Sequence, residues 1–183
     1  MDVLEYVLNS EGGYVNHKND RGGETYKGIA RNFWGNWEGW PLIDRMDRGK
    51  YRTDREFTEA LEKLPKLNEK VAAFYKKEFW DRMRLDEVKS DKIKLLMMDF
   101  GVNFGHKRAV KYAQICSGAF VDSLIGPKTI AAINSTDGNK FCYQFLMECM
   151  EGYYSLVQRN DSQRVFFFGW IGRVVRAYYK VRE

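Results

Sequence analysis

Apolar residues recur at helical spacing along most of the chain. The first run, residues 2–10, carries five of them and predicts a short helix that ends at Glu11. No long run alternates between apolar and polar residues, so the pattern predicts a mainly α fold. The same spacing predicts later helices over residues 54–61, 65–80, 93–102, 107–116, 141–158 and 163–179. A further helix is expected to start in the turn at residues 122–129 and to run through Ile133.

Local residue types support several of these helix starts and suggest where the chain divides. Thr53 or Asp54 has the chemistry of a helix N-cap, and Pro65 suits the first position of the next helix. Residues 86–91 form a polar break. We therefore expect a first lobe over residues 1–88 and a helical second lobe over 89–183, packed together as one compact unit.

Glycine and polar residues concentrate between residues 12 and 29, which predicts a small hairpin or an extended loop. Glu11 stands at the end of the first helix, and the two glycines after it clear side chains from the backbone, so a polymer can approach closely. Asp20 follows nine positions later and could lie opposite Glu11 across the loop. Two carboxylates in different surroundings are the minimum for acid–base hydrolysis of a glycosidic bond. The alternative is that Glu11 is a solvated residue beside an ordinary helix end.

Three tryptophans, Trp34, Trp37 and Trp40, recur at three-residue spacing. Either they form one aromatic face packed on the core, or they form a wall of a sugar-binding groove. The chain holds five Trp, eleven Tyr and twelve Phe, and we expect most of these rings to pack in the core.

The formal net charge is +5, with acidic and basic residues well mixed. This distribution does not favour nucleic acid as a partner, but it suits an anionic polymer such as the bacterial cell wall. The three cysteines lack the spacing of a disulfide framework and are expected to be buried as small apolar residues. The two histidines belong to no cluster with metal-ligand spacing, so we expect neither a metal nor another cofactor.

The N-terminus lacks the basic and apolar segments of a cleaved signal peptide, and the apolar stretch 165–179 is too short and too charged to span a bilayer. We expect a soluble monomer without stable membrane insertion. Gly126-Pro127-Lys128-Thr129 has some likeness to a phosphate-binding loop, but proline interrupts the Gly-Lys step, so we expect no nucleotide site.

The N-terminal glycine-rich region resembles the signature of the glycoside hydrolase family 108 N-acetylmuramidases of bacteria and phages. The part of the chain after it resembles the predicted peptidoglycan-binding domain that accompanies this family. Some members are labelled secretion activators. The motifs that carry the two resemblances are Glu11 to Asn16, Asp20 to Gly23, Thr25, Gly28-Ile29, Asp99 to Gly105, Asp122 to Thr129 and Phe168 to Arg173.

This resemblance implies a lysozyme-like α+β fold in which a small N-terminal hairpin flanks the active-site cleft. It implies cleavage of the β-1,4 bond between N-acetylmuramic acid and N-acetylglucosamine, with Glu11 as the general acid, a role that needs a raised pKa. Asp20 and Thr25 would hold the attacking water, which predicts carboxylates ~6.5–9.5 Å apart and inversion at the anomeric carbon. Asp20 could instead only shape the turn.

Other residues of the motifs are candidates for sugar binding with an equally plausible structural role: Tyr14, Asn16 and Tyr26 in the first lobe, and Asp99 and Asn103 in the second. Two positions depart from the family pattern, since Ala30 replaces the commoner threonine and Gly101 stands where alanine is frequent. The expected place of action is the periplasm or cell wall, reached with a holin or by another route. The alternative function is a non-catalytic wall-binding or secretion-assisting protein on the same fold.

Overall fold

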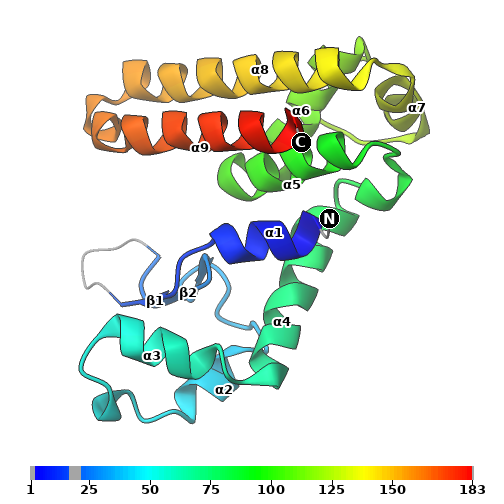
Figure 1. Cartoon of the computed structure of the whole chain (residues 1–183). Coiled ribbons are helices and arrows are strands. Elements are labelled where there is room, and N and C mark those ends of the chain that lie inside the picture. The colour runs from blue at the N-terminus through cyan, green and yellow to red at the C-terminus, as the bar shows by residue number, and fades with distance from the viewer. Residues whose placement is uncertain (1–2, 17–21, 183) are drawn as a thin grey trace. The chain divides into compact units, whose positions relative to one another are not determined.

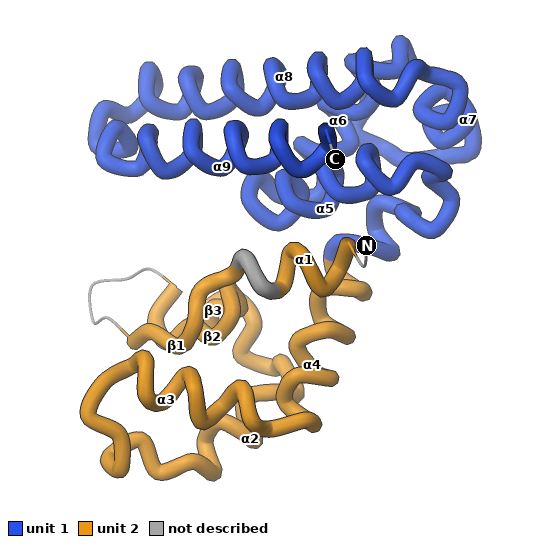
Figure 2. The backbone as a smooth tube through the Cα atoms, viewed as in Figure 1, with its two compact units in different colours: residues 1, 79–183 blue, residues 2–78 orange. Residues whose placement is uncertain are grey.

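The computed structural model describes residues 3–16 and 22–182 (Figure 1). The chain divides into two compact units, which we call the first unit (residues 2–78) and the second unit (residues 79–183) (Figure 2). The expectation of a mainly helical fold with a small N-terminal sheet is confirmed. The lobe boundary that we expected at residue 88 stays a prediction.

Short helices surround a small antiparallel sheet in the first unit. The sheet has the order β1-β2-β3, with Tyr14 opposite Tyr26 and Tyr26 opposite Ile29. All three of these side chains are buried, and they form the centre of the unit's core together with Phe57 and Leu61. The elements are α1 (Val3–Ser10), β1 (Tyr14–Val15), β2 (Thr25–Tyr26), β3 (Ile29–Ala30), α2 (Trp40–Asp44), a 3₁₀ turn (Arg48–Lys50), α3 (Asp54–Leu61) and α4 (Pro65–Tyr75).

Helix starts in this unit follow the residues that the sequence indicated. The Thr53 hydroxyl accepts a hydrogen bond from the Glu56 backbone N–H at 3.1 Å, so Thr53 is the N-cap of α3. Pro65 opens α4. After Tyr75 the helical segment continues to Asp81 in π-helical form (Lys76–Asp81), and the division between the two units falls within it.

The second unit is a helical bundle built around α5. Nearly every residue from Ile93 to Gly101 is buried, because α6, α8 and α9 all pack against this helix. A helix buried nearly all round is mostly apolar, and this segment is so apart from Lys94 and the buried Asp99. Its elements are a 3₁₀ turn (Leu85–Glu87), α5 (Asp91–Phe104), α6 (His106–Ser117), α7 (Pro127–Ser135), α8 (Gly138–Arg159), a 3₁₀ turn (Asp161–Gln163) and α9 (Arg164–Arg182).

Gly101 has a packing reason. A Cβ at this position would lie 2.6 Å from the Cε atom of the buried Met83, so even an alanine would force the methionine to move. Gly101, which stands where alanine is frequent in the family pattern, therefore lies in the core of the second unit.

Cys116, Cys142 and Cys149 are free and buried, as expected. Burial raises the pKa of Cys116 to about 12 and that of Cys142 to about 11, so both thiols stay protonated and unreactive at neutral pH. No helix within residues 3–16 and 22–182 is both long enough and apolar enough to cross a membrane.

Candidate active site

The carboxylate of Glu11 lies against the turn that joins β2 to β3. Glu11 follows the last residue of α1, its side chain is half-buried, and its Oε1 atom is buried. A Cβ added to Gly28 would lie 2.9 Å from Glu11 Oε2 and 2.7 Å from Tyr75 Oη. The absence of a side chain at Gly28 therefore makes the space in which the carboxylate sits.

This turn has a backbone that only a few residue types adopt readily. Lys27 and Gly28 both have positive φ, at 46° and 74°, as the two central residues of a type I′ hairpin do. Tyr75 Oη donates to the Lys27 carbonyl oxygen at 2.6 Å, and the Lys27 ammonium pairs with Glu62 at 2.5 Å. Tyr75 of α4 and Glu62, at the end of α3, thus hold the turn in place against Glu11.

The two glycines after Glu11 have different surroundings. A Cβ on Gly12 would meet nothing within 4 Å, whereas a Cβ on Gly13 would collide with the Thr58 side chain on α3. Thr58 Oγ1 accepts a hydrogen bond from the Tyr14 backbone N–H at 2.8 Å, which fixes the start of β1. Gly13 therefore permits close packing, and Gly12 leaves the backbone beside Glu11 open.

A hydrogen-bonded network supports the sheet from its other side. Tyr14 is buried, and its hydroxyl donates to Glu24 Oε1 at 2.9 Å. Arg31 pairs with the second oxygen of Glu24 at 2.7 Å and with Asp44 at 2.5 Å. Burial, with a smaller contribution from Glu24, raises the pKa of Tyr14 to about 12, so the tyrosine remains a neutral donor.

The remaining candidates of the first unit lie around this sheet. The Thr25 hydroxyl is half-buried and donates to the Gly23 carbonyl oxygen at 3.1 Å. Asn16 is exposed, with its side chain in hydrogen-bonding reach of the Tyr14 hydroxyl. Tyr26 is fully buried. Asp20 lies outside the described residues, and the catalytic and sugar-binding roles of all these residues stay predictions.

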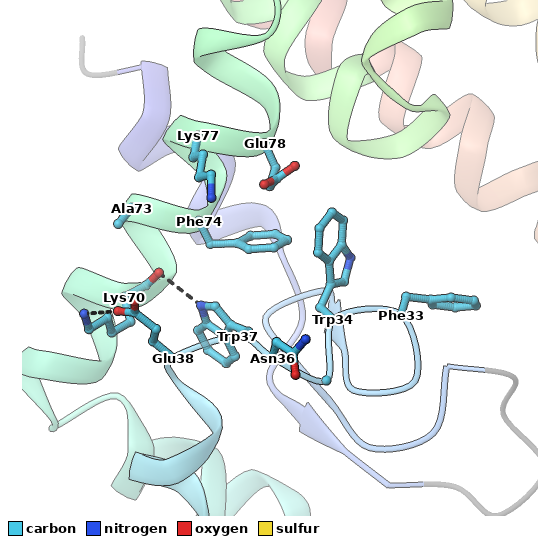
Figure 3. Close-up of a pocket in the computed structure, with 11 residues that line it drawn as sticks. Phe33, Trp34, Asn36, Trp37, Glu38, Lys70, Ala73, Phe74, Lys77 and Glu78 are labelled. Carbon is cyan, nitrogen blue, oxygen red and sulfur yellow. Dashed lines mark hydrogen bonds and ion pairs between the residues drawn. The ribbon is translucent and has the colours of Figure 1, made fainter.

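A pocket of about 420 Å³ opens beside the tryptophans of the first unit (Figure 3). The rings of Phe74 and Trp34 are in edge-to-face contact, with their centroids 4.9 Å apart, and Figure 3 shows both rings at the pocket wall. Phe74 also contacts Tyr75, at 5.5 Å, so the pocket wall adjoins the residue that holds the Gly28 turn. The pocket is lined by Phe33, Trp34, Gly35, Asn36, Trp37, Glu38, Lys70, Ala73, Phe74, Lys77 and Glu78.

Side chains hold this wall in place. Trp37 Nε1 donates to the Lys70 carbonyl oxygen at 3.3 Å, and Glu38 forms an ion pair with the Lys70 ammonium. The third tryptophan, Trp40, is buried, and its Nε1 donates to the Trp34 carbonyl oxygen at 2.8 Å. Two of the three tryptophans therefore line a pocket, while the third belongs to the core.

The two candidates of the second unit lie one helical turn apart on α5. Asp99 is buried and pairs with Arg173 of α9 at 2.7 Å. Burial raises the pKa of Asp99 and outweighs the opposite effect of Arg173. Asn103 is exposed, and its Oδ1 accepts a hydrogen bond from Tyr153 Oη at 2.6 Å. Asp99 thus connects two of the motifs noted in the sequence, because Arg173 ends the Phe168–Arg173 motif.

The third motif of this unit forms a loop around Gln114, whose side chain is fully buried. Its amide nitrogen donates to Asp122 Oδ1 at 2.7 Å and to the Leu124 carbonyl oxygen at 2.9 Å. Its amide oxygen accepts from the backbone N–H groups of Asp122 and Ser123. Through these contacts Asp122 stabilises the loop before α7. Within the described part of the chain, no three or more His, Cys, Asp or Glu side chains gather in a way that could hold a metal ion.

Comparison with known protein families shows to which family the chain belongs. The family model of glycosyl hydrolase 108 matches residues 4–105, more than half of the chain. The chain belongs to glycosyl hydrolase family 108. In this family 108 chain, residues 108–175 match a second model, described as a predicted peptidoglycan domain.

A solved structure gives the same picture of the fold. The family 108 chain is similar to SagA of Brucella abortus, with a TM-score of 0.70 and 25% sequence identity over 98% of this chain and 91% of that one. The lysozyme-like, mainly helical fold and the family resemblance are thereby confirmed. No curated protein matches significantly.

The sequence indicated Glu11 as a candidate, but it gave no sign of two residues that hold the neighbouring backbone in the family 108 chain. Tyr75 contacts the Gly28 turn from 48 positions away, and Thr58 binds the Tyr14 backbone from 44 positions away. No local pattern reports such contacts. A signal for the turn did exist, because Lys27-Gly28 lies between two short β segments and glycine is favoured there.

Proposed function

We propose that this chain is an N-acetylmuramidase that hydrolyses the β-1,4 bond between N-acetylmuramic acid and N-acetylglucosamine in peptidoglycan. Membership of glycosyl hydrolase family 108 and the match to a peptidoglycan domain indicate a peptidoglycan-related function. The position of the Glu11 carboxylate in the space beside Gly28 is the observation that supports this specific reaction.

In the proposed mechanism Glu11 protonates the oxygen of the leaving sugar as the glycosidic bond breaks. Water then attacks the positively charged anomeric carbon of the other sugar, forms the new C–O bond and gives up a proton to a second carboxylate. A carboxylate that performs this role must keep its orientation, and the contacts of the turn with Tyr75 and Glu62 supply that rigidity. The open backbone at Gly12 leaves room for a glycan strand next to the carboxylate.

We assign the second part of the chemistry, the positioning of water, to Asp20 and Thr25. The support is the order of these residues in the family motif, together with the position of Thr25 in the strand that leads into the Gly28 turn. The two carboxylates would then lie ~6.5–9.5 Å apart, and hydrolysis would invert the anomeric centre.

The aromatic pocket beside Trp34 is our candidate for a sugar subsite of the same enzyme. Its volume lies in the range of ligand pockets, and it combines the rings of Trp34 and Phe74 with polar groups such as Asn36 and Lys77. Sugar rings stack on aromatic faces and use nearby polar groups to fix their orientation. Phe74 of this wall directly precedes Tyr75, whose hydroxyl binds the turn beside Glu11.

Digestion of purified peptidoglycan with the wild-type chain and with Glu11→Gln tests the proposal. Mass spectrometry of the products should show new N-acetylmuramic acid reducing ends from the wild type, and a loss of about 10²–10⁴-fold in rate for Glu11→Gln. Glu59→Gln is the matched control, because Glu59 is an exposed glutamate of the same unit that pairs only with Arg55 in the described structure.

Each other outcome has a definite meaning. Equal release by wild type and Glu11→Gln would remove Glu11 from the role of acid. Release of N-acetylglucosamine reducing ends would show that the other glycosidic bond is cleaved. No release by either protein, with binding to sacculi retained, would favour a non-catalytic wall-binding function.

A further inference from the structure

Helix α9 presents an exposed apolar strip. Val165, Phe168, Val175 and Tyr179 have exposed fractions of 76%, 86%, 46% and 64%. At ~100° per residue their spacings of three, seven and four positions place them along one side of the helix. The other side packs into the bundle, where Val174, Ala177 and Val181 are buried. The solvated side of a bundle helix is normally polar, so a continuous apolar strip there indicates an interaction surface.

Cations border this strip on both sides. The same spacing places Arg164 and Arg182 along one border and Arg176 and Lys180 along the other. Helix α9 contains no aspartate or glutamate, and Arg164 forms a long ion pair of 3.7 Å with the exposed Asp161 of the preceding turn. The remaining cation of the helix, Arg173, is turned inward to Asp99.

An apolar strip between two rows of cations matches the interface of an anionic lipid layer. There the apolar side chains enter the boundary of the acyl chains while arginine and lysine contact the phosphates. The charge pattern argues against pairing of α9 with its copy in a second chain, since cations would then face cations. It also argues against a glycan strand, because the strip includes two valines and the helix lacks carboxylates and amides that would bind sugar hydroxyls.

We propose that the outer face of α9 adsorbs to the surface of membranes that contain anionic phospholipids. The helix lies in the headgroup region with the rest of the bundle above it, and the membrane is not crossed. Adsorption concerns the second unit alone, so it stands independently of the reaction assigned to Glu11.

Co-sedimentation of the full chain with vesicles tests the proposal. We expect binding to vesicles of phosphatidylglycerol and phosphatidylcholine, weakened by salt, and little binding to phosphatidylcholine alone. The double variant Val165→Ser/Phe168→Ser should bind at least about tenfold more weakly. Arg176→Gln should bind about fivefold more weakly.

Matched controls come from the loop before α7 and from α7 itself. Phe120→Ser changes a phenylalanine that is 83% exposed, and Lys128→Gln removes an exposed cation, yet neither residue belongs to α9. Both variants should bind vesicles like the wild type. All variants should release muropeptides from purified peptidoglycan at the wild-type rate.

Any one of four results would overturn the proposal. Equal binding to neutral and anionic vesicles would show that the cations of α9 do not determine adsorption. Binding to neither kind of vesicle would show that the chain does not adsorb to membranes. Wild-type binding to sacculi but not to vesicles, abolished by Val165→Ser/Phe168→Ser, would make the strip a polymer-binding surface. A dimer in sedimentation velocity that the same variant dissociates, without vesicle binding, would make it a contact between copies.

Discussion

Glu11 and Asp99 are acidic residues of two glycine-containing motifs, but they lie in opposite surroundings. Glu11 follows the end of a short helix, half-exposed, in the space left by Gly28. Asp99 lies in the middle of the most buried helix of the chain and pairs with Arg173. The first carboxylate is held next to open backbone, whereas the second is enclosed by its own unit.

This difference separates two reasons for an acidic residue to stand in a motif. A carboxylate that acts on a substrate has to be reachable, and rigid neighbours have to fix it from behind. A buried carboxylate with an arginine partner connects two helices, and its cost in desolvation is offset only while the partner remains. We therefore infer a chemical role for Glu11 and a structural one for Asp99, and four predictions test the distinction.

The largest effect on stability should come from Arg173→Met. It leaves the Asp99 carboxylate buried without its partner, which typically costs about 3–5 kcal/mol. Urea denaturation followed by circular dichroism measures the change at pH 7. Arg159→Met, which removes an exposed arginine of α8, should change the free energy of unfolding by less than about 0.5 kcal/mol.

The pH dependence of that cost identifies Asp99 as its source. Because burial raises the pKa of Asp99 in the folded chain, protonation stabilises the fold, and this contribution is lost as the pH rises through the folded-state pKa. Loss of Arg173 raises this pKa further. The destabilisation by Arg173→Met should therefore shrink as the pH falls from 7 toward 4, and a cost that does not change with pH would contradict the role of Asp99.

The next effect concerns the Glu11 side of the comparison. Gly28→Ala places a methyl group 2.9 Å from Glu11 Oε2, at a residue with φ of 74°. We expect muropeptide release to fall about 10²-fold, since a small displacement of a catalytic group has that effect, with a loss of about 1–2 kcal/mol in stability. Gly126→Ala is the control, because a Cβ at that position meets nothing within 4 Å and the backbone there is extended, with φ of −109°. Wild-type activity in Gly28→Ala would separate the turn from the reaction.

How far the sequence predicted this arrangement depends on the range of the contacts involved. Helical periodicity located α5, α6, α8 and α9, and only their ends differ from the expected ranges. The α8 helix begins at Gly138, before the expected residue 141, because the Asp137 side chain caps it by accepting from the Lys140 N–H at 2.8 Å. Such an end is set by one polar contact, which apolar spacing does not report.

Other features depend on contacts that no local pattern contains. The segment from Pro65 was expected to be one helix to Trp80, but it turns π-helical after Tyr75. The three tryptophans share one spacing, yet Trp40 is buried while Trp34 lines the pocket. For Trp40 the difference comes from its position in the core, where its indole N–H binds the Trp34 carbonyl oxygen.

A third prediction concerns the pocket beside the Glu11 turn. Trp34→Ala should raise the KM for peptidoglycan fragments about tenfold with a smaller change in kcat, because a stacking surface is lost while Glu11 is untouched. Trp34→Phe should restore most of the affinity. The fold is expected to tolerate both changes, since the Trp40 indole binds only the backbone carbonyl of Trp34. An unchanged KM would exclude the pocket as a subsite.

The smallest effect should come from Tyr14→Phe, which tests whether the network behind the sheet supports the reaction or only the fold. Loss of the 2.9 Å hydrogen bond to Glu24 should cost about 0.5–1.5 kcal/mol, because Arg31 still pairs with that carboxylate.

The effect of alkaline pH on stability provides a control for the Tyr14→Phe prediction. The pKa of Tyr14 is raised to about 12, above the unfolded value of about 10, so its stabilising contribution is present below pH ~10 and is lost as the pH rises through 12. The difference in unfolding free energy between wild type and Tyr14→Phe should therefore narrow over that interval. Muropeptide release at neutral pH should fall less than about threefold, since Tyr14 supports β1 while the Gly28 turn is held separately by Tyr75. A loss comparable with that of Gly28→Ala would instead make the network part of the catalytic machinery.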